Sequence, residues 1–282
     1  MNDVGNIQWF PGHMTKTRRL IEADLKMVDA VVEITDARIP ESSRNPILDE
    51  LVKDKPRIIL MNKCDYADET ATRAWKQYSE KKGIRVLTCD CRSGKGLNAF
   101  LPEVKRLLAE LIERRKKRGM IGKALRLMVV GIPNVGKSSF INRMAKTKKT
   151  KVGDKPGVTR GKQWVSIDKD VELLDMPGIL WPKFDDQLAA QRLAFTGAIK
   201  DDVMDTEALA RALGAVLKEQ YPDLLNARYK LTGDEDILRD IAKSRGMLVS
   251  GGEPDAERAA AALLDEYRGG KIGRITLEKP GR

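Results

Sequence analysis

Residues 131–138 read Gly-Ile-Pro-Asn-Val-Gly-Lys-Ser, and they stand between the apolar run Arg126–Gly131 and an amphipathic segment. The spacing is that of the phosphate loop G-x-x-x-x-G-K-S, which joins a strand to a helix. Its glycines let backbone N–H groups surround phosphates, Lys137 offers an ammonium to the β and γ oxygens, and Ser138 offers a hydroxyl to Mg²⁺. The loop alone is compatible with ATP and with GTP. The expected phosphate contacts are Asn134, Val135, Gly136, Lys137, Ser138 and Ser139.

The sequence around this loop predicts an α/β fold. Between residues 30 and 175, short β-branched runs alternate with amphipathic stretches, which is typical of a mostly parallel sheet with flanking helices. The expected strands are Ala30–Asp36, Arg57–Asn62, Arg85–Thr88, Arg126–Gly131 and Val171–Leu174. The expected helices between them are Asp68–Lys82 and Leu97–Arg118.

The periodicity changes after Gly178, where apolar residues recur at helical spacing and no strand is convincing. Because 282 residues suit two domains of ordinary size, we expect two cores. The nucleotide-binding domain would span residues 1–182, and a small all-α domain would span residues 183–282. The helices expected there are Leu188–Phe195, Thr206–Glu219, Asp236–Arg245 and Asp255–Tyr267.

A second motif identifies the base. Asn62-Lys63-Cys64-Asp65 ends a predicted strand and fits N-K-x-D, in which the Asp65 carboxylate accepts hydrogen bonds from N1–H and the 2-amino group of guanine. Adenine lacks both donors, so a carboxylate facing it would be left unpaired. We expect Asn62 to brace the site and Lys63 to lie along the base.

The N-K-x-D match alone has a fair chance of being an ordinary turn, but beside a phosphate loop it is a strong indication of GTP. At the outer face of guanine, Thr88 and Cys89 occupy the place of the usual S-A-K segment. That match is degenerate.

A third motif belongs to the γ-phosphate and the metal. Asp175-Met176-Pro177-Gly178 closes a predicted strand and fits D-x-x-G, in which Asp175 holds a magnesium-bound water and the Gly178 N–H contacts the γ-phosphate. The alternative is a strand-ending turn. Thr159, in the lysine-rich segment before this motif, is the second hydroxyl expected at Mg²⁺. We therefore expect a Mg²⁺ site at Ser138, Thr159 and Asp175, with GTP as the substrate.

The motifs run in an unusual order. In most GTPases the phosphate loop comes first and the guanine motif last, whereas here Asn62–Asp65 precedes Gly131–Ser138. This order predicts a circularly permuted GTPase domain, which is tolerated because chain termini usually lie close together. The Asp175–Gly178 turn then leads directly into the helical domain, so GTP can reorient that domain.

Composition restricts the partners and the compartment. The formal net charge is +11 at pH 7, with the excess confined to residues 1–199, which favours a polyanionic partner. No apolar run approaches the ~18 residues of a membrane span and no signal peptide is evident, so we expect a cytoplasmic protein without membrane contact.

The cysteines are expected to be reduced thiols. The basic run Arg114–Arg118 suits a helix C-terminus and is more often a solvated face than an RNA site.

Three further segments carry a family resemblance: Trp9-Phe10-Pro11-Gly12-His13-Met14, Asp36-Ala37-Arg38-Ile39-Pro40 and Gly273-Arg274-Ile275-Thr276-Leu277-Glu278. Together with the permuted order, they resemble the YlqF-type ribosome biogenesis GTPase A family over nearly the whole chain. The resemblance implies a cytoplasmic GTPase that acts late in assembly of the large ribosomal subunit. Its helical domain would bind ribosomal RNA, and the precursor particle, with its rRNA and ribosomal proteins, would stimulate hydrolysis. We expect a monomer.

The resemblance also bears on hydrolysis. Many GTPases place a glutamine after D-x-x-G to orient the attacking water, whereas this chain has Ile179 there. The resemblance implies a catalytic role for His13, the only histidine; the alternative is that His13 packs or touches RNA. Asn134 resembles the asparagine that helps hold K⁺ beside the phosphates in related GTPases, or it merely forms a turn. Asp36 and Arg38 either shape the site or form a structural ion pair.

Two other functions stay open at this stage. One is a GTP-gated RNA-binding placement module in which hydrolysis has little role, and Ile179 keeps it open. The other is a membrane or signalling GTPase. It is disfavoured by the missing lipidation motif, the missing hydrophobic anchor and the basic charge of the sheet domain.

Overall fold

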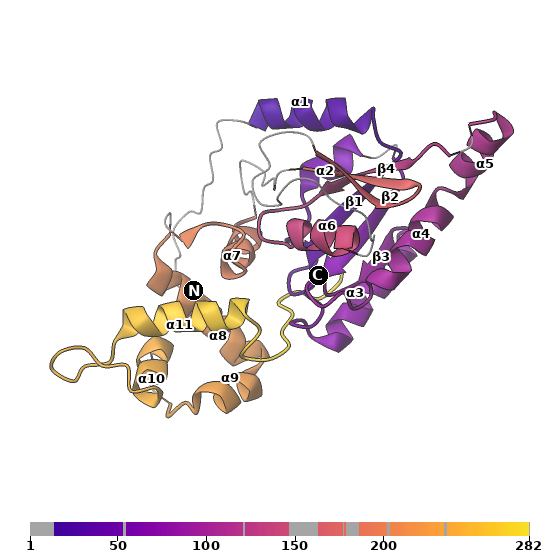
Figure 1. Cartoon of the computed structure of the whole chain (residues 1–282). Helices are drawn as coiled ribbons and strands as arrows, with labels where there is room; N and C mark the ends of the chain where they lie inside the picture. The colour runs from indigo at the N-terminus through magenta and orange to yellow at the C-terminus, as the bar shows by residue number, and fades with distance from the viewer. Residues whose placement is uncertain are drawn as a thin grey trace.

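The computed structural model describes residues 14–52, 55–120, 122–146, 163–176, 178, 186–201, 204–233 and 236–281. Figure 1 shows a sheet with helices on both faces on one side of the molecule and a group of helices, drawn in orange and yellow, on the other. The chain passes from the first part to the second once and then returns, because its C-terminus lies beside the sheet (Figure 1).

The described residues form a six-stranded sheet in the order β3-β2-β1-β4-β6-β5. Strand β5 runs antiparallel to β6, and all other neighbours are parallel. The predicted strands and the mostly parallel α/β fold are confirmed, with strand ends within one residue. The sequence did not predict the edge strand β5, whose side chains are mostly half-buried or exposed and give a weak apolar pattern. The strands are β1 (Ala30–Asp36), β2 (Arg57–Asn62), β3 (Arg85–Thr88), β4 (Leu125–Val130), β5 (Gln163–Asp168) and β6 (Val171–Asp175).

Helices cover both faces of the sheet because successive strand residues point to opposite sides. On one face, Val31 packs in a cluster with α1 (Met14–Leu25) and α2 (Pro46–Leu51), and α3 (Glu69–Lys81) covers β2 and β3. On the other face, Val32 packs in the cluster that includes α4 (Phe100–Leu107) and α6 (Lys137–Lys146).

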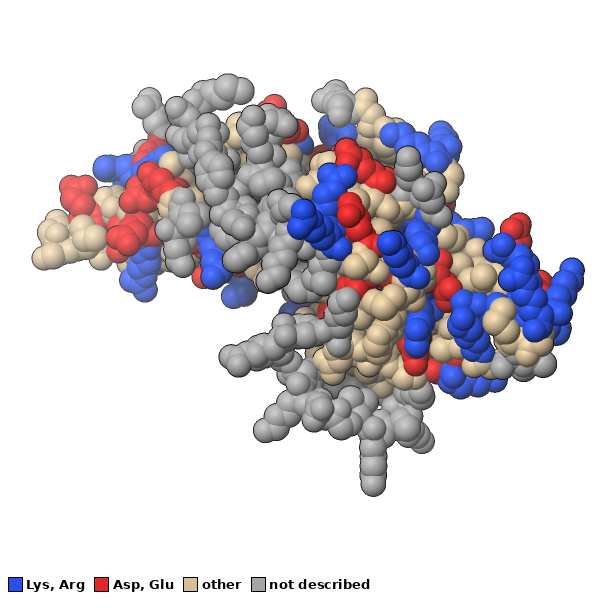
Figure 2. Space-filling model, turned by 90° about the horizontal axis from the view of Figure 1, so that it is seen from above, with Lys and Arg blue, Asp and Glu red and all other residues tan. Residues whose placement is uncertain are grey.

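The single helix predicted at Leu97–Arg118 is wrong. The structure has a 3₁₀ turn, η1 (Leu97–Ala99), then α4, then α5 (Ala109–Lys117), with a break at Leu108. Phe100, Val104 and Leu108 are buried, whereas α5 has no buried residue. The helix therefore breaks at the last of these fully buried residues, and α5 projects from the body (Figure 1). Figure 2 shows lysine and arginine side chains gathered at this end of the molecule.

The second half of the molecule is helical, as predicted. Aspartate N-caps explain where most of its helices begin, because each carboxylate accepts a first-turn backbone N–H. The sequence did not predict α9, a short helix that begins at Pro222 and buries only Leu225 and Tyr229. The helices are α7 (Gln187–Phe195), α8 (Thr206–Gln220), α9 (Pro222–Tyr229), α10 (Ile237–Ser244) and α11 (Ala256–Arg268).

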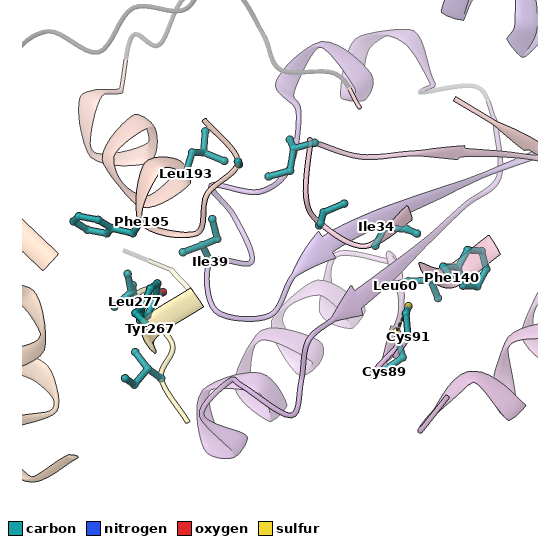
Figure 3. Close-up of a cluster of buried hydrophobic side chains, with 14 of the residues drawn as sticks. Ile34, Ile39, Leu60, Cys89, Cys91, Phe140, Leu193, Phe195, Tyr267 and Leu277 are labelled. Atoms are coloured by element: carbon teal, nitrogen blue, oxygen red, sulfur yellow. Dashed lines mark hydrogen bonds between the residues drawn. The ribbon is translucent and has the colours of Figure 1, made fainter. Parts of the chain in front are cut away.

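The two halves share one continuous core where the sequence predicts two. A single cluster of buried apolar residues runs from the sheet through α7 into the helical half. Figure 3 shows Ile39, after β1, close to Leu193 of α7 and to Tyr267 and Leu277 from the last part of the chain. The boundary predicted between residues 182 and 183 lies outside the described residues and stays a prediction.

A buried arginine also joins the halves. The Arg38 guanidinium donates to both carboxylate oxygens of Asp36, at 3.0 and 2.8 Å. Its Nη1 donates to the carbonyl oxygens of Tyr267 and Arg268, at 3.1 and 3.3 Å, where the end of the α11 dipole favours a cation. Burial raises the pKa of Asp36, but Arg38 and Lys63 outweigh it and hold that pKa well below its usual range.

We expect Arg38→Met to lower the free energy of unfolding by about 3–5 kcal/mol, because it removes one of the two cations that pair with the buried Asp36 carboxylate among the described residues. Equilibrium urea unfolding measures the change. Arg18→Met, at an exposed arginine that pairs with exposed glutamates, is the matched control and should stay within about 0.5 kcal/mol of the parent. A cost below about 1 kcal/mol for Arg38→Met would contradict this role.

Candidate nucleotide-binding site

The predicted motifs follow strands that run side by side. The guanine motif follows β2, the phosphate loop follows β4 and the Asp175 turn follows β6, all parallel members of one sheet. The carboxyl ends of parallel strands lie at the same edge, which is where α/β proteins bind ligands. Segments that are distant in the sequence therefore meet along one edge of the sheet.

Asn62 ties the guanine motif to the phosphate loop. Its Nδ2 donates to the carbonyl oxygen of Val135 at 2.7 Å, and its Oδ1 accepts from the Cys91 N–H at 2.9 Å. The side chain is buried, so both contacts are protected from water. Gly136 has φ +105°, and a Cβ there would collide with the Asn62 amide, so the second glycine of the loop admits this contact. The Cys91 contact was not predicted, because a backbone donor leaves no sequence motif.

The phosphate loop turns sharply between β4 and α6. Gly131 has φ +153°, and a Cβ there would lie 2.6 Å from the carbonyl oxygen of Ile34 on β1. Asn134 adopts a left-handed conformation with φ 58°, which asparagine tolerates better than most residues. Ser138 and Ser139 are exposed in the first turn of α6.

Lys137 is buried within this loop. Its Nζ donates to the carbonyl oxygens of Gly131 and Ile132, at 3.0 and 2.7 Å. Burial lowers the pKa of Lys137 to about 8, against the opposing effect of Asp175. Carbonyl oxygens satisfy the ammonium hydrogens without a full negative charge, so phosphate oxygens fit as its counter-charge.

Asp65 has a carboxylate oxygen that suits a guanine base. Its Oδ1 is buried and has no hydrogen-bond partner, and burial raises the pKa of Asp65. A buried acceptor without a donor is costly. The N1–H and 2-amino groups of guanine would supply two donors, so this residue fits the predicted ligand.

Lys63 connects the guanine motif to the buried ion pair of the fold. Its Nζ lies 2.9 Å from Asp36 Oδ2, and its backbone is left-handed with φ 60°. Asp36 therefore contacts Lys63 on one side and Arg38 on the other. The geometry supports both alternatives left open above: the pair is structural, and it also holds a residue of the site.

The segment after β3 contains Thr88 and Cys89, two of the predicted guanine residues. The Cys89 side chain is fully buried, and its Sγ lies 3.7 Å from that of Cys91. The Cys89 N–H donates to the Met61 carbonyl, and its own carbonyl accepts from Cys64 N–H. Thr88 is half-buried. A guanine contact by either residue stays a prediction.

The Asp175 turn lies against the phosphate loop. A Cβ on Gly178 would lie 2.9 Å from Lys137 Nζ and 3.0 Å from the Pro133 Cα, so only glycine allows this approach. Ser138 and Asp175 flank Lys137, and their hydroxyl and carboxylate oxygens are the donors that Mg²⁺ prefers. Within the described ranges, no cluster of three or more metal-ligating side chains occurs, which is compatible with an ion held mainly by phosphate and water. His13 and Thr159 lie outside the described residues.

The phosphate loop also contacts the helical half. The Asn134 Nδ2 donates to the carbonyl oxygen of Gly197, in the turn after α7, at 2.6 Å. Nothing at Gly197 in the sequence indicates this contact. A side chain of the phosphate loop is thus bonded directly to the helical part.

Comparison with known proteins agrees with this geometry. The family model described as "50S ribosome-binding GTPase" matches residues 126–225, which begin in β4 and include the phosphate loop and Asp175. The guanine motif precedes that span, as the permuted order requires. Ribosome biogenesis GTPase A of Bacillus licheniformis is 48% identical and covers 97% of this chain and 98% of its own length. The Thermotoga maritima protein of the same name is 34% identical, with 97% and 95% covered.

Two solved structures resemble the whole chain. A GDP-bound structure of TM YlqF has a TM-score of 0.67 and 29% identity, covering 94% of this chain and 100% of its own. The GNP-bound YlqF from T. maritima has a TM-score of 0.64 and 30% identity, covering 94% and 99%. The motifs at one sheet edge and relatives similar over nearly the full length lead to one conclusion: this chain is a GTPase and belongs to the ribosome biogenesis GTPase A family.

Proposed function

We propose that this GTPase is an assembly factor that acts late in maturation of the large ribosomal subunit. Its GTP-bound form binds the rRNA and ribosomal proteins of the precursor particle, and hydrolysis stimulated by the particle releases it. The names of the relatives and the net charge of +11 support this proposal. The alternative is a nucleotide-gated RNA-binding placement module with little catalytic role for hydrolysis.

The observation that carries the nucleotide assignment is the buried, unpartnered Asp65 oxygen in a motif that Asn62 ties to the phosphate loop. Asp65 accepts hydrogen bonds from guanine, and Asn62 holds its loop in place. The base also lies next to Lys63, Thr88 and Cys89. Lys137 neutralises the β and γ oxygens, while backbone N–H groups of the loop and of Gly178 bind phosphate. The remaining phosphate-binding residues are Asn134, Val135, Gly136, Ser138, Ser139 and Thr159.

We expect Asp65→Asn to change the base preference. An amide replaces one acceptor by a donor, which conflicts with the 2-amino group of guanine and matches the 2-oxo group of xanthine. GDP affinity should fall about 100-fold or more while XDP affinity rises, as measured by fluorescence titration. Asp68→Asn is the matched control, because Asp68 caps α3 and asparagine caps equally well. If Asp65→Asn keeps the parent's preference for GDP, the guanine assignment is wrong.

Contacts of the phosphate loop connect the nucleotide site to the helical domain. Gly178 lies against Lys137 and Pro133, and Asn134 is bonded to Gly197 after α7. Movement of the Gly178 turn toward a γ-phosphate would therefore disturb the loop to which α7 is attached. We infer that the nucleotide state biases the position of the helical domain.

Hydrolysis needs a group to orient water, because Ile179 cannot. We propose His13 for this role, with Mg²⁺ held by Ser138, Thr159 and Asp175. Mg²⁺ bound with GTP neutralises charge that develops on the phosphate oxygens. We further propose that the Asn134 amide oxygen holds K⁺, since the Nδ2 of the same side chain donates to the Gly197 carbonyl and so fixes the orientation of the amide.

His13→Ala should lower single-turnover GTP hydrolysis in the presence of large-subunit precursors by about 100-fold or more. Co-sedimentation with the particles and a non-hydrolysable GTP analogue should stay unchanged, because His13 is not needed for binding. Unchanged stimulated turnover would remove His13 from the mechanism. Absence of any stimulation in the parent protein would instead favour the placement module.

Helix α5 is a candidate RNA contact on the sheet domain. Arg115 pairs with Asp29 at 2.5 Å, whereas the neighbouring basic side chains have no acidic partner among the described residues. Unpaired cations on a projecting helix can neutralise RNA phosphates without first breaking an ion pair. Their side chains are exposed on a projecting helix, at the end of the molecule where Figure 2 shows lysine and arginine side chains gathered, and this concentration of charge favours RNA contact over the solvated face expected from the sequence. The unpaired side chains are Arg114, Lys116, Lys117 and Arg118.

We expect replacement of these four residues by glutamine to weaken co-sedimentation with precursor particles about tenfold or more and to reduce its salt dependence. The matched control replaces Arg73, Lys76 and Lys81 of α3 and its C-cap residue Lys82 by glutamine, with the same change of net charge. Arg73 and Lys76 already pair with Glu69 and Glu80, so this variant should bind nearly normally. Equal losses in both variants would show a general charge effect and contradict a site on α5.

We also propose two domains for this chain. Residues 1–182 form the permuted GTPase domain, and residues 183–282 form the helical RNA- and ribosome-binding domain. The protein works as a cytoplasmic monomer without membrane contact. In the part of the chain that the structure covers, no helix combines the length and the apolar character of a membrane span.

A further inference from the structure

The segment Gly273–Glu278, here called the C-terminal strap, lies across the loops that follow β1 and β2. The Leu277 N–H donates to the Arg38 carbonyl at 2.8 Å, and the Ile275 N–H donates to the Tyr66 carbonyl at 2.9 Å. Arg38 follows β1, and Tyr66 directly follows Asp65. The strap therefore spans the gap between two loops at the nucleotide edge of the sheet.

The strap holds the backbone at Asp65 and in the residues just after it. Arg274 Nε donates to the Asp65 carbonyl oxygen at 3.2 Å. Thr276 Oγ1 accepts from the Asp68 N–H at 3.1 Å and donates to the Ala37 carbonyl at 3.2 Å. One hydroxyl thus bonds the end of the guanine loop to the loop after β1.

The end of the strap is anchored by a buried carboxylate. Glu278 is 4% exposed, and it accepts from the backbone N–H groups of Glu41 and Ser42, at 2.7 and 3.1 Å, and from the Ser42 hydroxyl. Arg192 of α7 supplies the counter-charge at 3.2 Å. Leu277 is buried beside Ile39 (Figure 3), so the strap is held by both polar and apolar contacts.

The strap also reaches the helical half. The Tyr221 hydroxyl, at the junction of α8 and α9, accepts from the Thr276 N–H at 3.0 Å and donates to the Thr276 carbonyl at 2.8 Å. Tyr66 packs closely against Gly270, just after α11, where a Cβ would collide with its ring. Thr276 is therefore bonded to the guanine loop by its side chain and to the helical half by its backbone.

We propose that the C-terminal strap is a positioning element of the guanine site, and that it transmits occupation of that site to the helical half. The proposal rests on the proposed recognition of guanine by Asp65. Asp65 must meet N1–H and the 2-amino group at once, and hydrogen bonds weaken steeply when donor and acceptor are misaligned. A loop held at Asp65, Tyr66 and Asp68 by one segment keeps that alignment.

Thr276→Val and Thr276→Ser test this in the full-length protein, because valine keeps the shape of threonine without the hydroxyl and serine keeps the hydroxyl. The dissociation constants for GDP and IDP are measured, since IDP lacks the 2-amino group. Thr276→Val should weaken GDP about three- to tenfold and IDP less, so that discrimination between them falls. Thr276→Ser should restore both values toward those of the parent.

Thr232→Val is the matched control, because the Thr232 hydroxyl bonds to Asp240 within the helical half, away from the strap. It should leave both constants unchanged. An equal loss of GDP and IDP affinity in Thr276→Val, or the same effect in Thr232→Val, would overturn the proposal. Such results would indicate a general loss of stability.

Hydrogen exchange provides a second measurement, which uses the unaltered protein and so does not depend on whether a variant folds. GDP should slow exchange of the Ile275 and Leu277 amides, and ADP should not. Exchange that is insensitive to GDP would overturn the proposal.

Two variants separate failure of the strap from failure of guanine recognition. If Asp65→Asn leaves the base preference unchanged, guanine recognition itself fails. If Asp65→Asn switches the preference to XDP and Thr276→Val still discriminates between GDP and IDP, only the role of the strap fails.

Discussion

The Asn62 amide holds together two motifs, because it contacts a phosphate-loop residue 73 positions away in the chain. It donates to the phosphate loop at Val135 and accepts from the backbone at Cys91, so one buried side chain links the segments after β2, β3 and β4. Position 136 must be glycine in this geometry, because the Cβ of any larger residue would collide with the Asn62 amide. A buried amide without hydrogen-bond partners costs free energy. The Asn62 side chain is therefore held in the orientation that satisfies both its donor and its acceptor.

Permutation places the guanine motif early in the chain, and the structure braces it with the chain's other end. Arg38 bonds to the last carbonyls of α11, and Glu278 bonds to the loop after β1. These contacts are polar and buried, and each needs its donor and acceptor in one relative orientation. The apolar cluster beneath them is continuous, and its contacts do not require one orientation. The polar pairs therefore fix how the helical half sits on the sheet, since a shifted arrangement would leave charges unpaired.

Local patterns predicted the elements that have strong local causes. The strands β1, β2, β4 and β6 are mostly buried, apolar runs, and most predicted helices begin at an aspartate N-cap. Prediction failed where the cause lies elsewhere in the fold. The edge strand β5 has a weak pattern, and the helix breaks at Leu108, the last residue of its segment that is buried in the core.

The sequence by itself determined the nucleotide chemistry and the succession of strands and helices, because phosphate loops, N-K-x-D and D-x-x-G act through residues that are neighbours in the chain. It also revealed the permuted order. Only the tertiary structure decided that Arg274 and Thr276 bond to the backbone of the guanine loop, that Asn134 meets Gly197, and that both halves share one core. Those contacts join residues far apart in the chain, and hydrogen-bond partners at such separations are set by the packing of whole elements, which no local pattern encodes.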